Sequence, residues 1–116
     1  MLKLERQEIE LVTVIHASGE IDGVGATAFR EFISGCVADK RYQLVLDLSK
    51  VEYIDRMGVG ALLECLGSLQ TYHGNLKLAS LNIQSRRLLT AMCLGHVFES
   101  YESEVSAVKG YQQEAA

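Results

Sequence analysis

The sequence predicts a single α/β domain over residues 1–116, in which helices pack on a mixed, mostly parallel sheet in the order ββαβαβαβα. Its 116 residues are the size of one ordinary domain. Short apolar runs typical of strands alternate with segments in which apolar residues recur at helical spacing. Strands and helices that alternate in this way imply right-handed crossovers between parallel strands.

The chain opens with two expected strands, at residues 2–5 and 11–17, the second rich in the β-branched residues that favour strands. Polar residues 6–8 between them suit a turn, so the pair is predicted to be antiparallel. Residues 19–25 contain three glycines and are expected to form a loop. From 26 to 38 the apolar residues fall on one helical face, which predicts the first helix.

A continuous apolar run at 44–48, broken only by Asp47, predicts a central strand buried on both faces. Residues 49–55 are expected to form a connector. A strong apolar stripe then predicts a second helix, which ends near Gly74, where a C-cap glycine would stand.

Residues 76–79 predict the next strand, and Asn82 is expected to cap a third helix that ends at Gly95. Residues 97–98 are expected to begin a short last strand, and 102–113 to form an amphipathic helix. The expected core faces of these two helices are Leu88, Leu89, Met92 and Cys93 for the former, and Val105, Val108 and Tyr111 for the latter.

The composition argues against two classes of function. Eleven basic residues against fifteen acidic ones give a net charge of −4, which provides no attraction toward nucleic acid or an anionic membrane. No apolar run approaches the roughly 20 residues that cross a bilayer, and the first residues lack the apolar stretch of a signal peptide. We therefore expect a cytoplasmic protein with no nucleic-acid partner and no membrane insertion.

The cysteines and histidines form no recognised metal or redox motif. The three cysteines are an odd number without a C-x-x-C pair, and the three histidines are scattered along the chain. We expect no metal and no cofactor, although a metal site assembled from residues distant in sequence stays open. The residues concerned are Cys36, Cys65, Cys93, His16, His73 and His96.

Residues 23–28 fit the pattern G-x-G-x-x-A of a dinucleotide-binding loop ahead of a helix. Three features disfavour this interpretation. Residues 18–22 separate the first glycine from the preceding strand, Glu20 and Asp22 place negative charge beside the supposed phosphate site, and the chain is short for a dinucleotide-binding enzyme. We favour the interpretation that the glycines shape a turn into the first helix.

Asp22, Asp47 and Asp55 are the candidates for acid–base catalysis. Asp47 is better placed as the polar end of a buried strand, and Asp55 as the N-cap of the helix that begins near Arg56, where a cap contributes about 1 kcal/mol. No histidine or cysteine lies near them in sequence to complete a nucleophilic arrangement. We therefore expect that the protein is not an enzyme.

Two segments, 45–49 and 51–63, resemble the signature of STAS domains and are most similar to that of the bacterial anti-sigma factor antagonists. The family pattern is D-L-S, a short spacer, then D-S-S-G followed by a glycine and an apolar helix. Residues 19–22 resemble the family's G-E-hydrophobic-D segment, and 81–95 are similar to its third-helix region. The resemblance covers nearly the whole chain.

This resemblance implies a protein-binding module for transcription regulation by partner switching. The implied partner is an anti-sigma factor or related serine kinase that docks on the loop and helix at residues 53–63. In the family, this kinase phosphorylates the first serine after the aspartate, and the phosphate adds about −1.5 to −2 charge to the docking surface. Phosphorylation breaks the complex, whereas the unphosphorylated antagonist captures the anti-sigma factor.

The sequence departs from the family pattern at this switch. Arg56 occupies the phosphoacceptor position and Met57 that of the second serine, and neither side chain has a hydroxyl group. The nearby Ser49 and Tyr53 do not match the acceptor position. The resemblance therefore implies a non-phosphorylatable STAS protein.

The predicted partner contacts surround Arg56, which would form charge-assisted hydrogen bonds to a carboxylate of the partner. An ordinary solvent-exposed arginine is an equally good interpretation. A cation in the first helical turn costs about 0.3–1 kcal/mol against the helix dipole, which an ion pair with Asp55 or Asp22 would offset. Gly58 and Gly60 would serve either the close approach of a partner or packing inside the domain. The predicted partner-binding set is Asp22, Asp55, Arg56, Met57, Gly58, Val59 and Gly60.

The resemblance also fits a second kind of binding function, a STAS accessory or scaffold subunit of a transporter or signalling complex. Neighbouring genes would separate the two, with a sigma factor and kinase in one case and transporter components in the other. A homodimer is compatible with the sequence as well.

Overall fold

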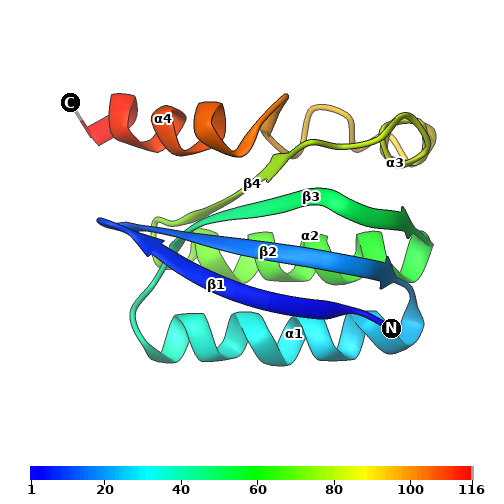
Figure 1. The fold of residues 1–116 in the computed structure, drawn as a ribbon, viewed down its shortest axis with the longest axis horizontal. Helices are drawn as coiled ribbons and strands as arrows, with labels where there is room; N and C mark the ends of the chain where they lie inside the picture. The colour runs from blue at the N-terminus through cyan, green and yellow to red at the C-terminus, as the bar shows by residue number, and fades with distance from the viewer. Residues whose placement is uncertain (116) are drawn as a thin grey trace.

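The computed structural model describes residues 1–115, which form a five-stranded sheet and four helices (Figure 1). The strands lie across the sheet in the order β1-β2-β3-β4-β5. The first pair is antiparallel and the others are parallel, so the predicted order and mixed sheet are confirmed. The elements are β1 (Lys3–Ile9), β2 (Val12–Ile21), α1 (Gly23–Ala38), β3 (Gln43–Ile54), α2 (Arg56–Gln70), β4 (Asn75–Ala79), α3 (Ile83–Ala91), β5 (Ser100–Tyr101) and α4 (Glu104–Ala115).

The turn of the opening hairpin lies later than its polar residues predicted. Residues 6–8 belong to β1 and pair with residues 13–15 of β2, and the chain reverses at Glu10, whose φ is 56°. β1 is an edge strand with an exposed side, so it accommodates Arg6, Gln7 and Glu8 without burying them. A run of consecutive polar residues on an edge strand is therefore easily mistaken for a turn.

The two central strands are longer than predicted, and this correction positions the site. Residues 19–21 and 49–54, expected to be loop and connector, continue β2 and β3 and pair with each other in parallel. Their register shifts twice, after His16 and after Gly19, which has a φ of 102°. These irregularities interrupt the periodicity on which strand prediction depends. Because β2 and β3 extend to Ile21 and Ile54, a single aspartate separates each strand from the next helix.

The helices cover the two faces of the sheet unequally (Figure 1). α1 and α2 lie side by side on one face, over the larger core. α4 covers the other face. The smaller core beneath α4 consists of Val12, Val14, Val45, Ala79, Ala107, Val108 and Tyr111.

α4 presents a slightly different face to the sheet than expected. Val108 and Tyr111 are buried as predicted, but Val105 is exposed, and Ala107 is buried instead. In a helix of 3.6 residues per turn, positions 107, 108 and 111 share one stripe and position 105 falls outside it. The small side chain at 107 packs against the valines of β2 and β3.

A fully buried lysine, Lys77 of β4, anchors α4 on the sheet. Its Nζ lies 2.7 Å from Glu114 Oε1, 3.0 Å from the Tyr101 hydroxyl and 4.5 Å from the centre of the Tyr111 ring. Burial lowers the pKa of Lys77, but the hydrogen bonds to Glu114 and Tyr101 outweigh burial, so that this pKa lies above its ordinary value. The charge is thus compensated where it is buried.

The predicted glycine caps are wrong at both α2 and α3. His73 rather than Gly74 takes the left-handed conformation after α2, and Cys93 rather than Gly95 does so after α3. Gly74 is needed for another reason, because a Cβ there would lie 2.7 Å from the Cβ of Tyr42. Cys93 is consequently exposed rather than in the core.

The final strand is also displaced. β5 comprises residues 100–101, not 97–98, and Phe98 is buried in the larger core instead of starting a strand. Of the predicted face of α3, Leu89 is buried and Leu88 and Met92 are partly buried. This short helix is therefore held by Leu89, with Leu88 and Met92 packed beside it, and by its cap.

Candidate functional site

Three helices begin at the end of the sheet toward which the arrows of β2 and β3 point (Figure 1). Each is capped by a side chain of the residue before it, which accepts a hydrogen bond from a free backbone N–H of the first turn. Asp22 Oδ1 accepts from Gly25 at 2.9 Å, Asp55 Oδ1 from Gly58 at 2.9 Å, and Asn82 Oδ1 from Ser85 at 2.8 Å. The predicted caps at Asp55 and Asn82 are confirmed, and Asp22 has the same role.

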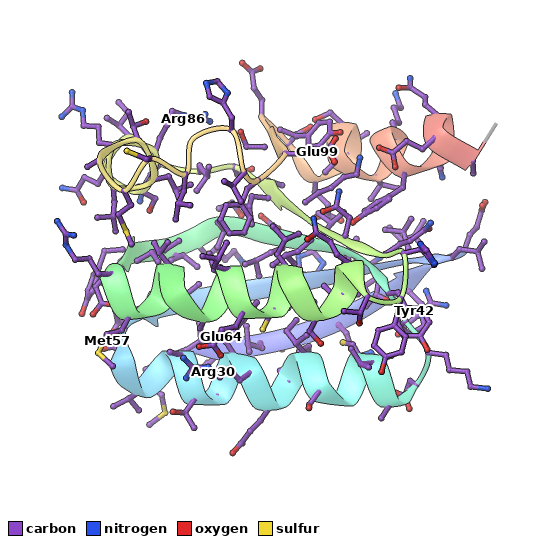
Figure 2. All side chains as sticks on the ribbon, turned by 180° about the vertical axis from the view of Figure 1, so that it is seen from behind. Arg30, Tyr42, Met57, Glu64, Arg86 and Glu99 are labelled. Carbon is purple, nitrogen blue, oxygen red and sulfur yellow. The ribbon has the colours of Figure 1, made fainter. Side chains whose placement is uncertain are left out.

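A hollow of about 500 Å³ lies between the end of β3, the start of α2 and α3. Met57 is 64% exposed and stands where α1 and α2 begin, as Figure 2 shows. The hollow therefore combines apolar side chains with an exposed backbone turn. We name it the helix-start hollow; its lining residues are Tyr53, Ile54, Asp55, Arg56, Met57, Gln84 and Leu88.

Arg56 is exposed at the first position of α2. The predicted ion pair with Asp55 or Asp22 is wrong, because among residues 1–115 Arg56 forms no salt bridge. Both aspartates instead direct a carboxylate oxygen to the amide of their own helix. The guanidinium at this helix start thus stays accessible to another molecule.

The two glycines that follow have different surroundings. Gly58 is buried, and a Cβ there would overlap the carbonyl oxygen of Ile21 and lie 2.9 Å from Ile54 Cγ2. Gly60 has no atom within 4 Å of the corresponding position. Gly58 therefore allows the first turn of α2 to pack against the end of β2, and Val59 beside it is buried. Gly58 and Val59, both in the predicted partner-binding set, are therefore buried and position the start of α2 without lying on its surface.

A glycine in the first turn of α1 is explained by packing as well. A Cβ at Gly25 would lie 2.6 Å from the carbonyl oxygen of Glu20, so only glycine lets the helix start so close to the strand that precedes it. α1 begins at Gly23 itself, and Ala26 is fully buried. The predicted turn at residues 23–28 and the predicted helix start at 26 are therefore wrong, because these residues already form the first turns of α1.

Carboxylates surround the exposed Tyr53 beside the helix-start hollow. Desolvation, followed by the negative charges of Asp22, Glu20, Asp55 and Glu52, raises the pKa of Tyr53. Glu20 is paired with the N-terminal ammonium at 3.1 Å. Carboxylates therefore lie close to one lining residue of the hollow, Tyr53, while Arg56 adds a positive charge to the lining.

The structure brings Asp47 next to a histidine that is remote in sequence. His16 and Asp47 are register partners in β2 and β3, and His16 Nδ1 lies 3.0 Å from Asp47 Oδ2. Burial raises the pKa of Asp47, but its hydrogen bonds with Ser49 and His16 outweigh burial, so that this pKa lies below its ordinary value. Only the strand register could have revealed this pair, since the two residues are 31 positions apart.

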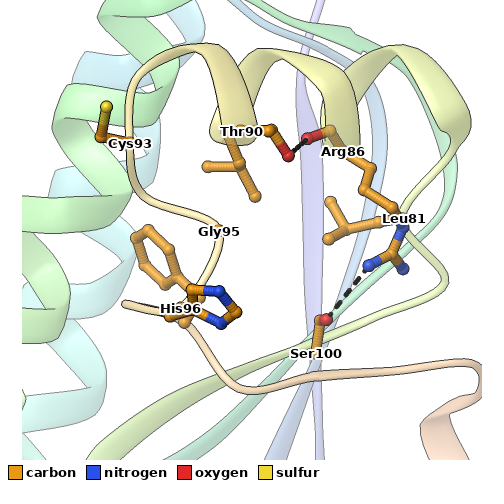
Figure 3. A pocket seen from close by; sticks show the side chains of 9 residues that line it. Leu81, Arg86, Thr90, Cys93, Gly95, His96 and Ser100 are labelled. Carbon is orange, nitrogen blue, oxygen red and sulfur yellow. Dashed lines mark hydrogen bonds between the residues drawn. The ribbon is translucent and has the colours of Figure 1, made fainter.

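A second hollow, of about 410 Å³, lies between α3 and the segment that leads to β5 (Figure 3). Leu89 and Phe98 provide apolar lining, and Arg86 Nη1 lies 3.5 Å from Ser100 Oγ at its side. No residue of the predicted site lines it.

None of the helices in residues 1–115 is long and apolar enough to span a bilayer.

Comparison with known proteins gives a consistent result. Residues 3–107 match the family model described as the STAS domain. Over 51 residues the chain is 43% identical to the anti-sigma-F factor antagonist RsfB of Mycobacterium tuberculosis, a match that covers 44% of this chain and 42% of RsfB, so less than half of that relative is matched.

Solved structures extend the likeness to the whole fold. An anti-sigma factor antagonist from Mycobacterium paratuberculosis is 27% identical, with a TM-score of 0.85 over 95% of this chain and 93% of the other. The murine anion transporter Slc26a9, in its inward-facing state, contains a similar fold with a TM-score of 0.79 and 23% identity. That match covers 92% of this chain and 18% of the transporter.

Proposed function

This chain belongs to the STAS domain family, and we propose that it is an anti-sigma factor antagonist-like module that binds an anti-sigma factor. Its relatives include proteins described as anti-sigma factor antagonists. On this proposal the partner is a regulatory serine kinase, bound in the bacterial cytoplasm, and the chain acts by occupying it rather than by catalysis. The docking surface is the loop and helix at residues 53–63.

The observation that carries the proposal is the pair of exposed side chains at the start of α2. Arg56 is exposed without an ion pair in residues 1–115, and Met57 is 64% exposed beside the helix-start hollow. A free guanidinium forms strong charge-assisted hydrogen bonds to a carboxylate. A methionine adapts its shape to an apolar partner surface. Both features support contact with another protein at this position.

We further propose that this docking is not controlled by phosphorylation at the helix start. Arg56 and Met57 stand at the two positions where the family pattern has serines, and neither offers a hydroxyl group to a kinase. Ser49 lies within β3, with its backbone N–H donated to Asp47, and not at a helix start. Binding would then depend on the amounts of the two proteins and not on a covalent switch.

The test uses the anti-sigma factor of the organism from which the chain comes, purified and titrated against the chain by calorimetry. Arg56→Asp is expected to weaken binding at least tenfold, because it replaces a charge-assisted contact with repulsion. Arg30→Asp is the matched control, because Arg30 is an exposed arginine of α1 that pairs with Glu64. Equal binding by Arg56→Asp and the parent would contradict the docking surface.

A second variant tests the missing switch. Arg56→Ser restores a hydroxyl at the acceptor position, and we expect the anti-sigma factor with ATP to phosphorylate this variant at residue 56, as mass spectrometry would detect. The parent is expected to remain unmodified in the same mixture. Phosphate on the parent, at Ser49 or elsewhere, would contradict the proposal of constitutive docking.

The transporter likeness favours a second candidate, an accessory or scaffold subunit. The similar fold in Slc26a9 is part of a much longer chain, which makes a role of this fold in a transporter assembly the second candidate. Binding to a transporter component, with none to an anti-sigma factor, would replace the first proposal by this one.

A further inference from the structure

Three metal-ligating side chains meet on the sheet face that α4 covers, outside the helix-start hollow. His16 comes from β2, Asp47 from β3 and Glu104 from the first turn of α4. His16 Nδ1 lies 3.0 Å from Asp47 Oδ2 and 3.7 Å from Glu104 Oε2, and all three donor atoms lie within 4.8 Å of one another. Their side chains are 36%, 13% and 29% exposed.

The two carboxylates converge without a lysine or arginine to neutralise them. Within residues 1–115, the salt bridges of Asp47 and Glu104 are with His16 alone. Like charges this close repel each other, the more so when they are partly shielded from water. A cation among the three side chains, either a proton on His16 or a metal ion, would relieve this repulsion.

The hydrogen bond on the far side of the imidazole orients the ring, so that Nδ1 faces the two carboxylates. His16 Nε2 lies 3.0 Å from Gln7 Oε1, an acceptor, so Nε2 carries a hydrogen. In the neutral ring the Nδ1 lone pair then faces the carboxylate oxygens, so that a metal ion between them would contact all three side chains, whereas a protonated ring would donate Nδ1–H to Asp47 Oδ2 at 3.0 Å. An outer hydrogen bond of this kind is what fixes the tautomer and orientation of metal-bound histidines.

We propose that His16, Asp47 and Glu104 bind a divalent transition-metal ion of the Zn²⁺ type. Bonds of about 2.0–2.2 Å around a tetrahedral ion place neighbouring donors ~3.3 Å apart, between the 3.0 and 3.7 Å observed from His16 Nδ1. Three protein ligands leave the fourth position to water. The second oxygen of Asp47 accepts the Ser49 N–H at 3.0 Å, which orients this ligand from outside.

Such an ion would link the start of α4 to the two central strands. An ion that binds only the folded chain stabilises it by mass action. None of the three ligands lines the helix-start hollow, so the site is independent of the proposed docking function. The scattered histidines of the sequence do not reveal it, because the register of β2 and β3 assembles it.

The test uses the full chain with Cys93→Ser, which removes the exposed thiol as a competing zinc ligand. After treatment with a chelator, ZnCl₂ is added at concentrations from 1 to 100 µM, and thermal unfolding and native mass spectrometry are recorded. We expect one bound Zn²⁺ per chain and a rise in melting temperature of about 5 °C at saturation. His16→Gln and Glu104→Gln should each abolish both effects.

The matched control is His96→Gln, which changes an exposed histidine beside the second hollow and should keep the full response. Circular dichroism at 10 °C shows whether each variant is folded, and mass spectrometry reads binding without relying on its stability. No zinc-dependent shift in the parent would overturn the proposal and leave a proton as the cation between the carboxylates. Undiminished binding by both His16→Gln and Glu104→Gln would overturn it as well.

Discussion

Replacing Gly58 by alanine should disrupt the start of α2, because the backbone of β2 occupies the space that a Cβ needs. The added atom would overlap the Ile21 carbonyl oxygen and lie 2.9 Å from the Ile21 carbonyl carbon and from Ile54 Cγ2. The same carbonyl oxygen accepts the Asp55 N–H at 3.2 Å. Backbone atoms cannot rotate away as a side chain does, so the helix must move.

The expected cost follows from these contacts. Overpacking a well-packed region costs 1–3 kcal/mol, and displacement of the turn also strains the Asp55 cap, which is worth about 1 kcal/mol. The better helix propensity of alanine returns somewhat less than 1 kcal/mol. The last two contributions nearly cancel, so we expect Gly58→Ala to lower the free energy of unfolding by about 1–3 kcal/mol.

Gly60→Ala provides the control within the same helix. No atom lies within 4 Å of its Cβ position, so the gain in helix propensity is unopposed, and stability should rise by about 0.5–1 kcal/mol. Urea unfolding followed by circular dichroism measures both variants, with equal slopes m required for the comparison. If Gly58→Ala were as stable as Gly60→Ala, the packing of α2 against β2 described here would be refuted.

Three further outcomes follow from the structure. Because the pKa of Lys77 is raised in the folded chain, the stability that charged Lys77 contributes is present below pH 10.5, its ordinary pKa, and is lost as the pH rises through the folded-state pKa. Lys77→Met should remove this part of the loss of stability at alkaline pH. Stability at pH 7 should change by about 1 kcal/mol or less, and urea unfolding between pH 7 and 11 would measure both effects. Of the three thiols, exposed Cys93 should react rapidly with Ellman's reagent, whereas Cys36 and Cys65 should react slowly because they are buried and burial raises the pKa of Cys65 to about 11; a fast phase that survives Cys93→Ser would contradict this. Asn82→Ala removes the cap of α3 and the hydrogen bond from Asn82 to the Glu52 carbonyl, so thermal unfolding should show a loss of about 1–2 kcal/mol. An unchanged stability would contradict a contribution of this cap.

The sequence predicted the elements well where one local signal dominated. The apolar stripe of α2 and the asparagine and aspartate caps were interpreted correctly, because a helix and its cap depend on residues within about four positions of one another. Element ends were less predictable. β2 and β3 continue past their apolar runs through irregular pairing, and β1 accommodates polar residues at an open edge.

The candidate site shows the same division. Consecutive residues of the sequence were enough to identify Arg56, Met57 and the Asp55 cap at the start of α2. They also show that positions 56 and 57 have no hydroxyl group. That Gly58 serves internal packing, whereas Gly60 does not, depends on how closely β2 approaches α2. The sequence alone left these two glycines equivalent.

What the sequence determined by itself was therefore the order of the elements, the family and the chemical groups at the start of α2. What the tertiary structure decided was which of these groups are accessible and which remote residues meet, as His16, Asp47 and Glu104 do. The physical reason is that periodicity and capping act along a few consecutive residues. Contacts between elements depend instead on strand register and helix placement, which the packing of the whole chain sets.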